Sequence, residues 1–254
     1  MKLFSIFILL WPILSWSQDS SIMETKFKLG NTKIGIYEQN SAASRDVIFL
    51  NVHEDETTSI EALYRYADID AINFFYLRHK WTRRITFKLK GTEFDFDPNR
   101  IFTKKGRKQT LKDGANYSGK ANRQVKKLAE AILERLPEGH TVVAVHNNTD
   151  ENYSIKSYAL GGEEAENTKR VFINPDTDPD DFIYTTDSYF YEAFKKMGVN
   201  VILQDNKGYV NDGSLSVYCG ENGIPYINIE TQKGHFDAQM NLIEQVLQVV
   251  RSRQ

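Results

Sequence analysis

The chain has 254 residues, of which 41% are hydrophobic and 12% aromatic, and its 34 acidic residues nearly balance 32 basic ones. This composition excludes a disordered chain, because there is enough apolar surface to offset the entropy cost of ordering. A formal net charge of −2 argues against a nucleic-acid partner, since no basic excess is present to displace counterions from phosphates. The single cysteine, Cys219, excludes an internal disulfide and a thiolate-rich zinc site, so a metal would need His, Asp or Glu ligands.

Residues 1–17 have the pattern of a secretory signal peptide. Lys2 precedes an apolar run at 3–14, and the small residues Ser15 and Ser17 follow it. The run is too short to span a bilayer comfortably, which favours cleavage after residue 17 over a retained anchor. We therefore expect an exported protein, secreted or periplasmic, with no membrane span after cleavage and a mature domain over 18–254.

Strand-like and helix-like segments alternate after this leader. Apolar or alternating runs predict strands at 45–52, 85–89, 92–97, 141–145, 171–173, 182–184, 199–203 and 226–229, and helical spacing predicts helices at 59–69, 122–136, 189–197 and 236–250. The runs on either side of Lys90-Gly91 predict a hairpin, and the basic run 104–108 is typical of a solvated loop. The alternation predicts a single α/β domain with a mixed, mostly parallel sheet flanked by helices. Sites in such sheets lie beyond the carboxyl ends of strands.

The first of these strand ends carries His53 and Glu56. An imidazole and a carboxylate three residues apart can turn to one point and bind a divalent cation, although the pair alone is more typical of a solvated acidic loop. The strand at 141–145 also leads into a histidine, His146. Two imidazoles and one carboxylate form a three-ligand set that leaves the fourth position of zinc open for water. A polar residue that caps a strand is the alternative interpretation of His146.

Two further segments end in charged residues. Glu230 follows the strand 226–229, where an ionised carboxylate is costly unless a cation or a metal-bound water accompanies it. Asn99 and Arg100 lie after the hairpin in a turn stiffened by Pro98, and the guanidinium fork suits a carboxylate. A structural salt bridge is the alternative interpretation of Arg100.

The order of these residues resembles that of zinc carboxypeptidases of the carboxypeptidase A type, also called funnelins. The matching positions are His53-x-x-Glu56, Asn99-Arg100, His146, Tyr209 and Glu230, and the segment 208–230 resembles the family most closely. The resemblance implies a catalytic domain over 18–254 and these roles: His53, Glu56 and His146 as ligands of one Zn²⁺ ion, Glu230 as general base and then acid, Asn99 and Arg100 as the clamp for a free substrate carboxylate, and Tyr209 as a lid.

Two family positions match less well. Arg83 and Arg84 lie roughly where the family has an arginine that stabilises the oxyanion, but both are more typical of the exposed edge of the hairpin. Leu215 falls where the family has the floor of its side-chain pocket, with Ser216 next to it. Neither residue is acidic, so a preference for basic terminal residues is not indicated.

These features predict an exported zinc-dependent hydrolase of an amide bond, most specifically a metallocarboxypeptidase that removes a C-terminal amino acid, with cell-wall peptides as candidate substrates. Zinc lowers the pKa of bound water from 15.7 toward about 7, and a nearby carboxylate can take the proton and return it to the leaving amine. One alternative is an N-acyl amino acid deacylase of the succinylglutamate desuccinylase and aspartoacylase type, which has a similar His-x-x-Glu and later His. Another is a non-catalytic peptide-binding protein on the same fold. The sequence indicates no oligomeric state.

Overall fold

The computed structural model describes residues 22–253 except 42–45, 115, 137 and 149–152. The predicted signal peptide, residues 1–17, lies outside the described residues. None of the helices in the described part has the length and apolar character needed to cross a bilayer.

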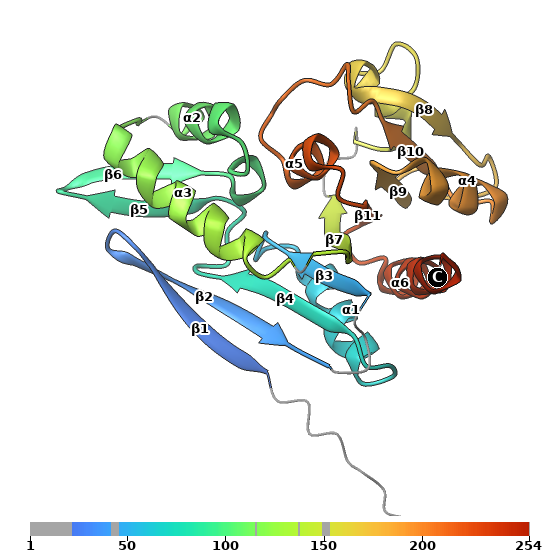
Figure 1. Cartoon of the computed structure of the whole chain (residues 1–254), viewed down its shortest axis with the longest axis horizontal. Helices are drawn as coiled ribbons and strands as arrows, with labels where there is room; N and C mark the ends of the chain where they lie inside the picture. Colours follow the sequence, from blue (N-terminus) through green and yellow to red (C-terminus); the bar gives the residue numbers. More distant parts are fainter. Residues whose placement is uncertain (1–21, 42–45, 115, 137, 149–152, 254) are drawn as a thin grey trace, which may run out of the picture.

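A nine-stranded mixed sheet forms the centre of the molecule (Figure 1), with the spatial order β1-β2-β4-β3-β7-β11-β9-β10-β8. Its strands are β1 (Met23–Leu29), β2 (Thr32–Gln39), β3 (Val47–Asn51), β4 (Asn73–Arg78), β7 (Thr141–Asn148), β8 (Thr168–Phe172), β9 (Phe182–Thr185), β10 (Val201–Gln204) and β11 (Tyr226–Gln232). Four central strands, β4, β3, β7 and β11, run parallel, as do β9 and β10. The remaining neighbours pair antiparallel. The prediction of a single α/β domain with a mixed sheet flanked by helices is confirmed.

The central strands form because their sequences are apolar on both faces. Every residue of β3 and of β7 is buried, as expected for parallel strands that are covered by helices on both sides. Ile48 and Leu50 of β3 face one core, whereas Val47 and Phe49 face the other. This alternation follows from the period of two along a strand.

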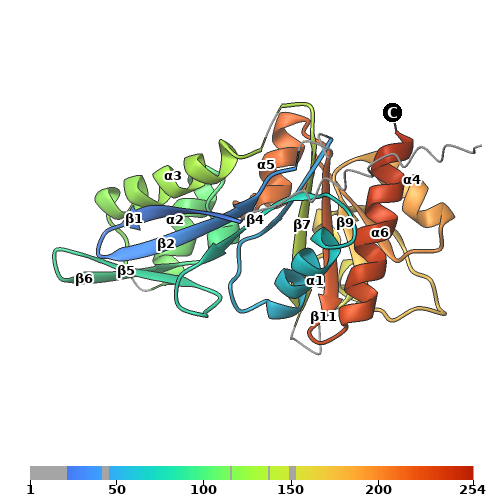
Figure 2. The same cartoon turned by 90° about the horizontal axis from the view of Figure 1, so that it is seen from below.

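Helices cover the two faces of the sheet (Figure 2). The bounds are α1 (Thr57–Ala67), α2 (Lys104–Asp113), α3 (Gly119–Leu133), α4 (Ser188–Lys196), α5 (Leu215–Asn222) and α6 (Phe236–Ser252). Residues of α2, α3 and α5 join the core of one face, and residues of α1, α4 and α6 join the core of the other. The predicted helices at 59–69, 122–136, 189–197 and 236–250 correspond to α1, α3, α4 and α6.

The predicted hairpin is present as β5 (Ile85–Leu89) and β6 (Thr92–Phe96). Lys90 and Gly91 both adopt positive φ, 49° and 84°, which is the conformation of a type I′ hairpin turn. Phe87 and Phe94 pack their rings together at 5.4 Å within the first core. The hairpin therefore covers part of the sheet and leads directly into the turn that carries Asn99 and Arg100.

The prediction that the basic run 104–108 is a solvated loop is wrong, because these residues begin α2. The Thr103 side chain accepts a hydrogen bond from the backbone N–H of Gly106 and so caps the helix. Leu111 anchors the other end in the core. Only a narrow stripe of this helix is buried, so its sequence is mostly charged and lacks the apolar periodicity that predicts a helix.

Candidate metal centre and substrate cavity

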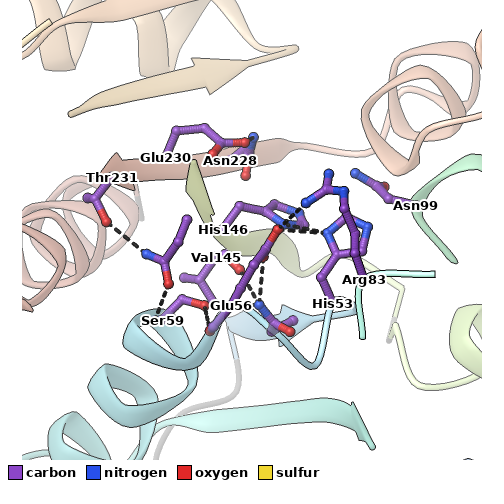
Figure 3. Close-up of polar contacts among 12 residues, drawn as sticks. His53, Glu56, Ser59, Arg83, Asn99, Val145, His146, Asn228, Glu230 and Thr231 are labelled. Carbon is purple, nitrogen blue, oxygen red and sulfur yellow. Dashed lines mark hydrogen bonds and ion pairs between the residues drawn. The ribbon is translucent and has the colours of Figure 1, made fainter. Parts of the chain in front are cut away.

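The chain brings His53, Glu56 and His146 to one point (Figure 3). His53 lies two residues beyond β3, Glu56 immediately precedes α1, and His146 lies in the neighbouring strand β7. The Nδ1 atom of His53 is 2.8 Å from Glu56 Oε1, and the Nδ1 atom of His146 is 2.7 Å from Glu56 Oε2. The two Nδ1 atoms are 3.3 Å apart. All three side chains are almost completely buried.

Residues behind this cluster hold its side chains in place. His53 Nε2 contacts Asp97 Oδ1 at 2.8 Å, and because the carboxylate accepts this hydrogen bond, the neutral ring keeps a lone pair on Nδ1. Asn51 Nδ2 donates to Glu56 Oε2 over 3.0 Å. A carboxylate behind a histidine is the usual support of a metal ligand. Two imidazole nitrogens and one carboxylate, buried and converging, therefore fit a Zn²⁺ ion with an open fourth position.

The pKa shifts at this cluster follow from its charges. Burial disfavours the ionised form of Glu56, but the two imidazoles outweigh burial and hold the pKa of this carboxyl well below its usual range. Burial also disfavours the charged form of His53, yet Glu56 and Asp97 raise the pKa of His53 to about 9. A cation at this point competes with a proton on the imidazole, so its binding strengthens as the pH rises.

Glu230 lies on β11 beside the cluster. It is the register partner of His146 in the parallel pair β7 and β11, and register partners place their side chains on the same face of a sheet. Glu230 is only 8% exposed. Burial raises the pKa of its carboxyl above the usual value, and Asn228 Nδ2 donates to Glu230 Oε1 over 3.0 Å. A carboxylate with a raised pKa in a cavity has the properties of a general acid and base.

Arg83 and Arg84 separate at the start of the hairpin. Arg83 lines the cavity, and its Nη1 donates to Glu56 Oε1 over 2.8 Å. Arg84 pairs instead with Asp95 on the hairpin. The prediction that both belong to the hairpin edge is therefore wrong for Arg83.

The conformation of the segment before Arg83 explains its position. The buried carboxylate of Glu54 accepts hydrogen bonds from the backbone N–H groups of His79 and Trp81, the latter over 2.8 Å. Trp81 adopts a positive φ of 58°, which is uncommon for a residue of its size. No pattern in the sequence predicts this backbone conformation, because the acceptor lies 27 residues earlier in the chain.

Asn99 and Arg100 both line the same cavity from the short 3-10 helix η1 (Pro98–Arg100). Arg100 Nε lies 3.3 Å from Asp212 Oδ2, and Asn99 Oδ1 accepts a hydrogen bond from the backbone N–H of Leu215 over 3.2 Å. Tyr209 also lines the cavity. Its hydroxyl donates to Glu221, which raises the pKa of Tyr209 to about 12.

The cavity has a volume of about 380 Å³, within the usual range for small-molecule sites. Beyond Glu230 its wall contains Tyr153, Tyr158, Tyr184, Tyr226, Gln204, Ser216 and Glu164. Leu215 is buried in the core and does not line it. The expectation about terminal residues considered only Leu215 and Ser216, whereas the cavity wall also contains the acidic residue Glu164, from a segment that no sequence pattern connected with this site.

No family model matches this chain, and no curated protein matches it. Among solved structures, a protein of Shewanella baltica described as a metallopeptidase is 11% identical, with a TM-score of 0.50 over 91% of this chain and 85% of its own. Murein-tripeptide amidase from Escherichia coli O157 is 12% identical, with a TM-score of 0.43 over 82% and 86%. Succinylglutamate desuccinylase from Chromobacterium violaceum is 11% identical, with a TM-score of 0.46 over 89% and 69%. The first likeness shows a shared fold.

Proposed function

We propose that this protein is an exported zinc-dependent hydrolase of amide bonds, and specifically a metallocarboxypeptidase that removes a C-terminal amino acid. The observation that carries the proposal is the convergence of His53, Glu56 and His146 beside the buried carboxylate of Glu230. The fold shared with the Shewanella baltica protein, and the order of residues that resembles funnelins, support it.

The residues of this cavity have different roles in the proposed reaction. Zinc, when bound by the His-Glu-His set, supplies a Lewis acid and lowers the pKa of water. Glu230 takes the proton from the attacking water and then donates it to the leaving amine. Arg83, whose guanidinium reaches the same cluster, offers positive charge to the oxygen of the scissile carbonyl. Asn99 and Arg100 hold the terminal carboxylate of the substrate.

Glu230→Gln tests the proton transfer. The amide keeps the shape of the side chain but cannot accept the proton, so hydrolysis falls by about 10²–10⁴-fold, while zinc remains near one equivalent. The assay is mass spectrometry of a panel of muropeptides, simple peptides and N-acyl amino acids, with and without chelator, alongside metal analysis. Glu244→Gln, which alters an exposed carboxylate of α6, is the matched control. Undiminished hydrolysis by Glu230→Gln removes this mechanism.

The same panel separates the substrate classes. Hydrolysis of N-acyl amino acids without hydrolysis of peptides would identify a deacylase of the succinylglutamate desuccinylase and aspartoacylase type. One equivalent of zinc without hydrolysis of either class would identify a binding protein. Removal of a terminal amino acid from peptides supports the carboxypeptidase.

Arg100→Ala tests recognition of the terminal carboxylate. A hydrogen bond to a charged group contributes about 1.5–3 kcal/mol, so KM rises about tenfold or more for peptides with a free carboxylate and changes little for their amidated forms. Arg107→Ala is the control, because Arg107 donates to the Ile101 carbonyl outside the cavity. Equal losses on both kinds of peptide would show that Arg100 is structural.

A further inference from the structure

Next to Glu230 the cavity extends into a hollow walled by tyrosines. The rings of Tyr153 and Tyr158 lie 6.0 Å apart, and those of Tyr158 and Tyr184 lie 5.4 Å apart. Their hydroxyl groups are already engaged, since Tyr153 and Tyr158 hydrogen bond to each other over 2.6 Å and Tyr184 donates to Gln204 Oε1 over 3.0 Å. The wall therefore combines aromatic surface with few free hydrogen-bond donors.

Glu164 adds a carboxylate to this hollow. It lies between the short 3-10 helices η2 (Ile155–Tyr158) and η3 (Ala165–Asn167), and its backbone N–H donates to the Ser157 carbonyl over 2.9 Å. One side-chain oxygen, Oε2, accepts from Asn167 Nδ2 over 2.7 Å. Glu164 lines the same cavity as Tyr153, Tyr158 and Tyr184, and its bond to Ser157 holds it next to the segment that carries Tyr158.

Several charged groups of the cavity are paired with opposite charge, whereas Glu164 and Glu230 form no ion pair among the described residues. Glu56 contacts Arg83 and the histidines, and Asp212 lies 3.3 Å from Arg100. Within the described residues, no Lys, Arg or His forms an ion pair with Glu164. A half-buried carboxylate beside aromatic rings is complementary to a cation, through both charge and cation–π attraction.

The hollow also adjoins the groups that fix the substrate backbone. Glu230, Arg100 and Tyr153 all line one cavity with Glu164. If Arg100 holds the terminal carboxylate and Glu230 serves the scissile bond, the side chain of the terminal residue is the group that enters the hollow.

We propose that the tyrosine hollow with Glu164 selects substrates whose C-terminal residue has a side chain ending in an amino or guanidinium group. This inference rests on the proposed function and specifies its substrate class. Glu164 is the specificity-determining residue. The resemblance to funnelins implies this role for Leu215, next to Ser216, but neither of these residues is acidic.

The test is a series of acylated dipeptides that differ only in the terminal residue: lysine, Nε-acetyl-lysine and norleucine. For the zinc-loaded protein, kcat/KM for the lysine peptide exceeds that for the norleucine peptide by about tenfold or more, the factor that about 1.4 kcal/mol of charge pairing gives. Acetylation removes the advantage, and added salt reduces it. A norleucine peptide cleaved as well as the lysine peptide overturns the proposal.

Glu164→Gln locates the effect. In this variant the ratio of kcat/KM for the lysine peptide to that for the norleucine peptide falls to about one, whereas the matched variant Glu163→Gln, at an exposed neighbouring position, retains the preference. A preference that survives in Glu164→Gln overturns the assignment. If that variant does not fold, as judged by circular dichroism, the comparison of the three peptides on the unaltered protein decides the proposal.

Failure of the proposed function gives a different result. If the zinc-loaded protein cleaves none of the three peptides, the hydrolase proposal fails, and calorimetric binding of the same peptides tests the hollow independently. Tighter binding of the lysine peptide than of both neutral peptides supports the hollow as a cation-selective site. Equal affinities overturn it.

Discussion

Two clusters of potential metal ligands lie at the same end of the sheet. Donor atoms converge in both, but the clusters differ in burial and in the contacts around them. The inner cluster is His53, Glu56 and His146, and the outer cluster is Asp178, Asp181 and His235; in each, one donor atom per residue lies within 4.8 Å of the others. The inner cluster is buried, whereas the outer cluster is exposed or half-buried. Convergence of donors alone therefore does not distinguish a metal centre from a surface group of acids.

The surroundings of the two clusters make the distinction. In the outer cluster, Asp178 Oδ1 accepts from the backbone N–H of Asp180 over 3.0 Å, and Asp181 Oδ1 accepts from the backbone N–H of Gln232 over 3.1 Å. In these hydrogen bonds the carboxylates of the outer cluster stabilise the backbone of the surrounding loops. In the inner cluster, Asp97 binds the outward Nε2 of His53, so that Nδ1 faces the other ligands, and Asn51 holds Glu56 through Oε2, the oxygen that faces His146. Burying a carboxylate is costly without a positive partner, so the inner cluster has the stronger reason to hold a cation.

Removal of one histidine from each cluster gives the largest expected contrast. His146→Ala reduces bound zinc from one equivalent per chain to near zero and abolishes hydrolysis, because two ligands are too few for a stable site. His235→Ala leaves both properties unchanged. Metal analysis after dialysis and peptide hydrolysis measure the contrast. Two equivalents of zinc in the unaltered protein, or loss of zinc in His235→Ala, would contradict the distinction between the clusters.

Loss of the support behind His53 should produce a smaller effect. Asp97→Asn weakens the hydrogen bond to His53 Nε2 and makes the inner cluster more like the outer one, so zinc affinity falls by about 10–100-fold. Competition with a chromogenic chelator measures the affinity. Asp95→Asn, which alters the partner of Arg84 on the hairpin, is the matched control. Equal affinities in the two variants would show that Asp97 has no part in orienting the ligand.

Three of the four central strands and the ligand positions could be predicted from the sequence because each is encoded locally. The strands β3, β7 and β11 are short apolar runs, and each leads to a polar residue at the edge where parallel strands converge. By contrast, β1, β2 and the central strand β4 were not predicted. Six of the seven residues of β1 are exposed or half-exposed edge positions with alternating lysines, so a packing signal is weak there.

The rest of the site depends on contacts between distant segments. Arg83 reaches Glu56 because Glu54 binds the backbone of the segment before it. Glu164 reaches the cavity because a turn between two 3-10 helices folds against Ser157. Neither residue belongs to a periodic pattern or to a strand end. Their placement depends on tertiary contacts, which a local sequence motif does not predict.

The smallest expected effect concerns Glu230, which joins the inner cluster to the substrate cavity. Burial raises the pKa of this carboxyl, and the hydrogen bond from Asn228 lowers it by stabilising the ionised form. The base must be ionised, so kcat/KM rises with pH through this pKa. Asn228→Ala removes the stabilising bond and moves the acidic limb of the profile to higher pH. Ser216→Ala, a cavity residue whose hydroxyl contacts Ser214 instead, leaves the limb in place. A limb that moves to lower pH in Asn228→Ala would show that another group controls it.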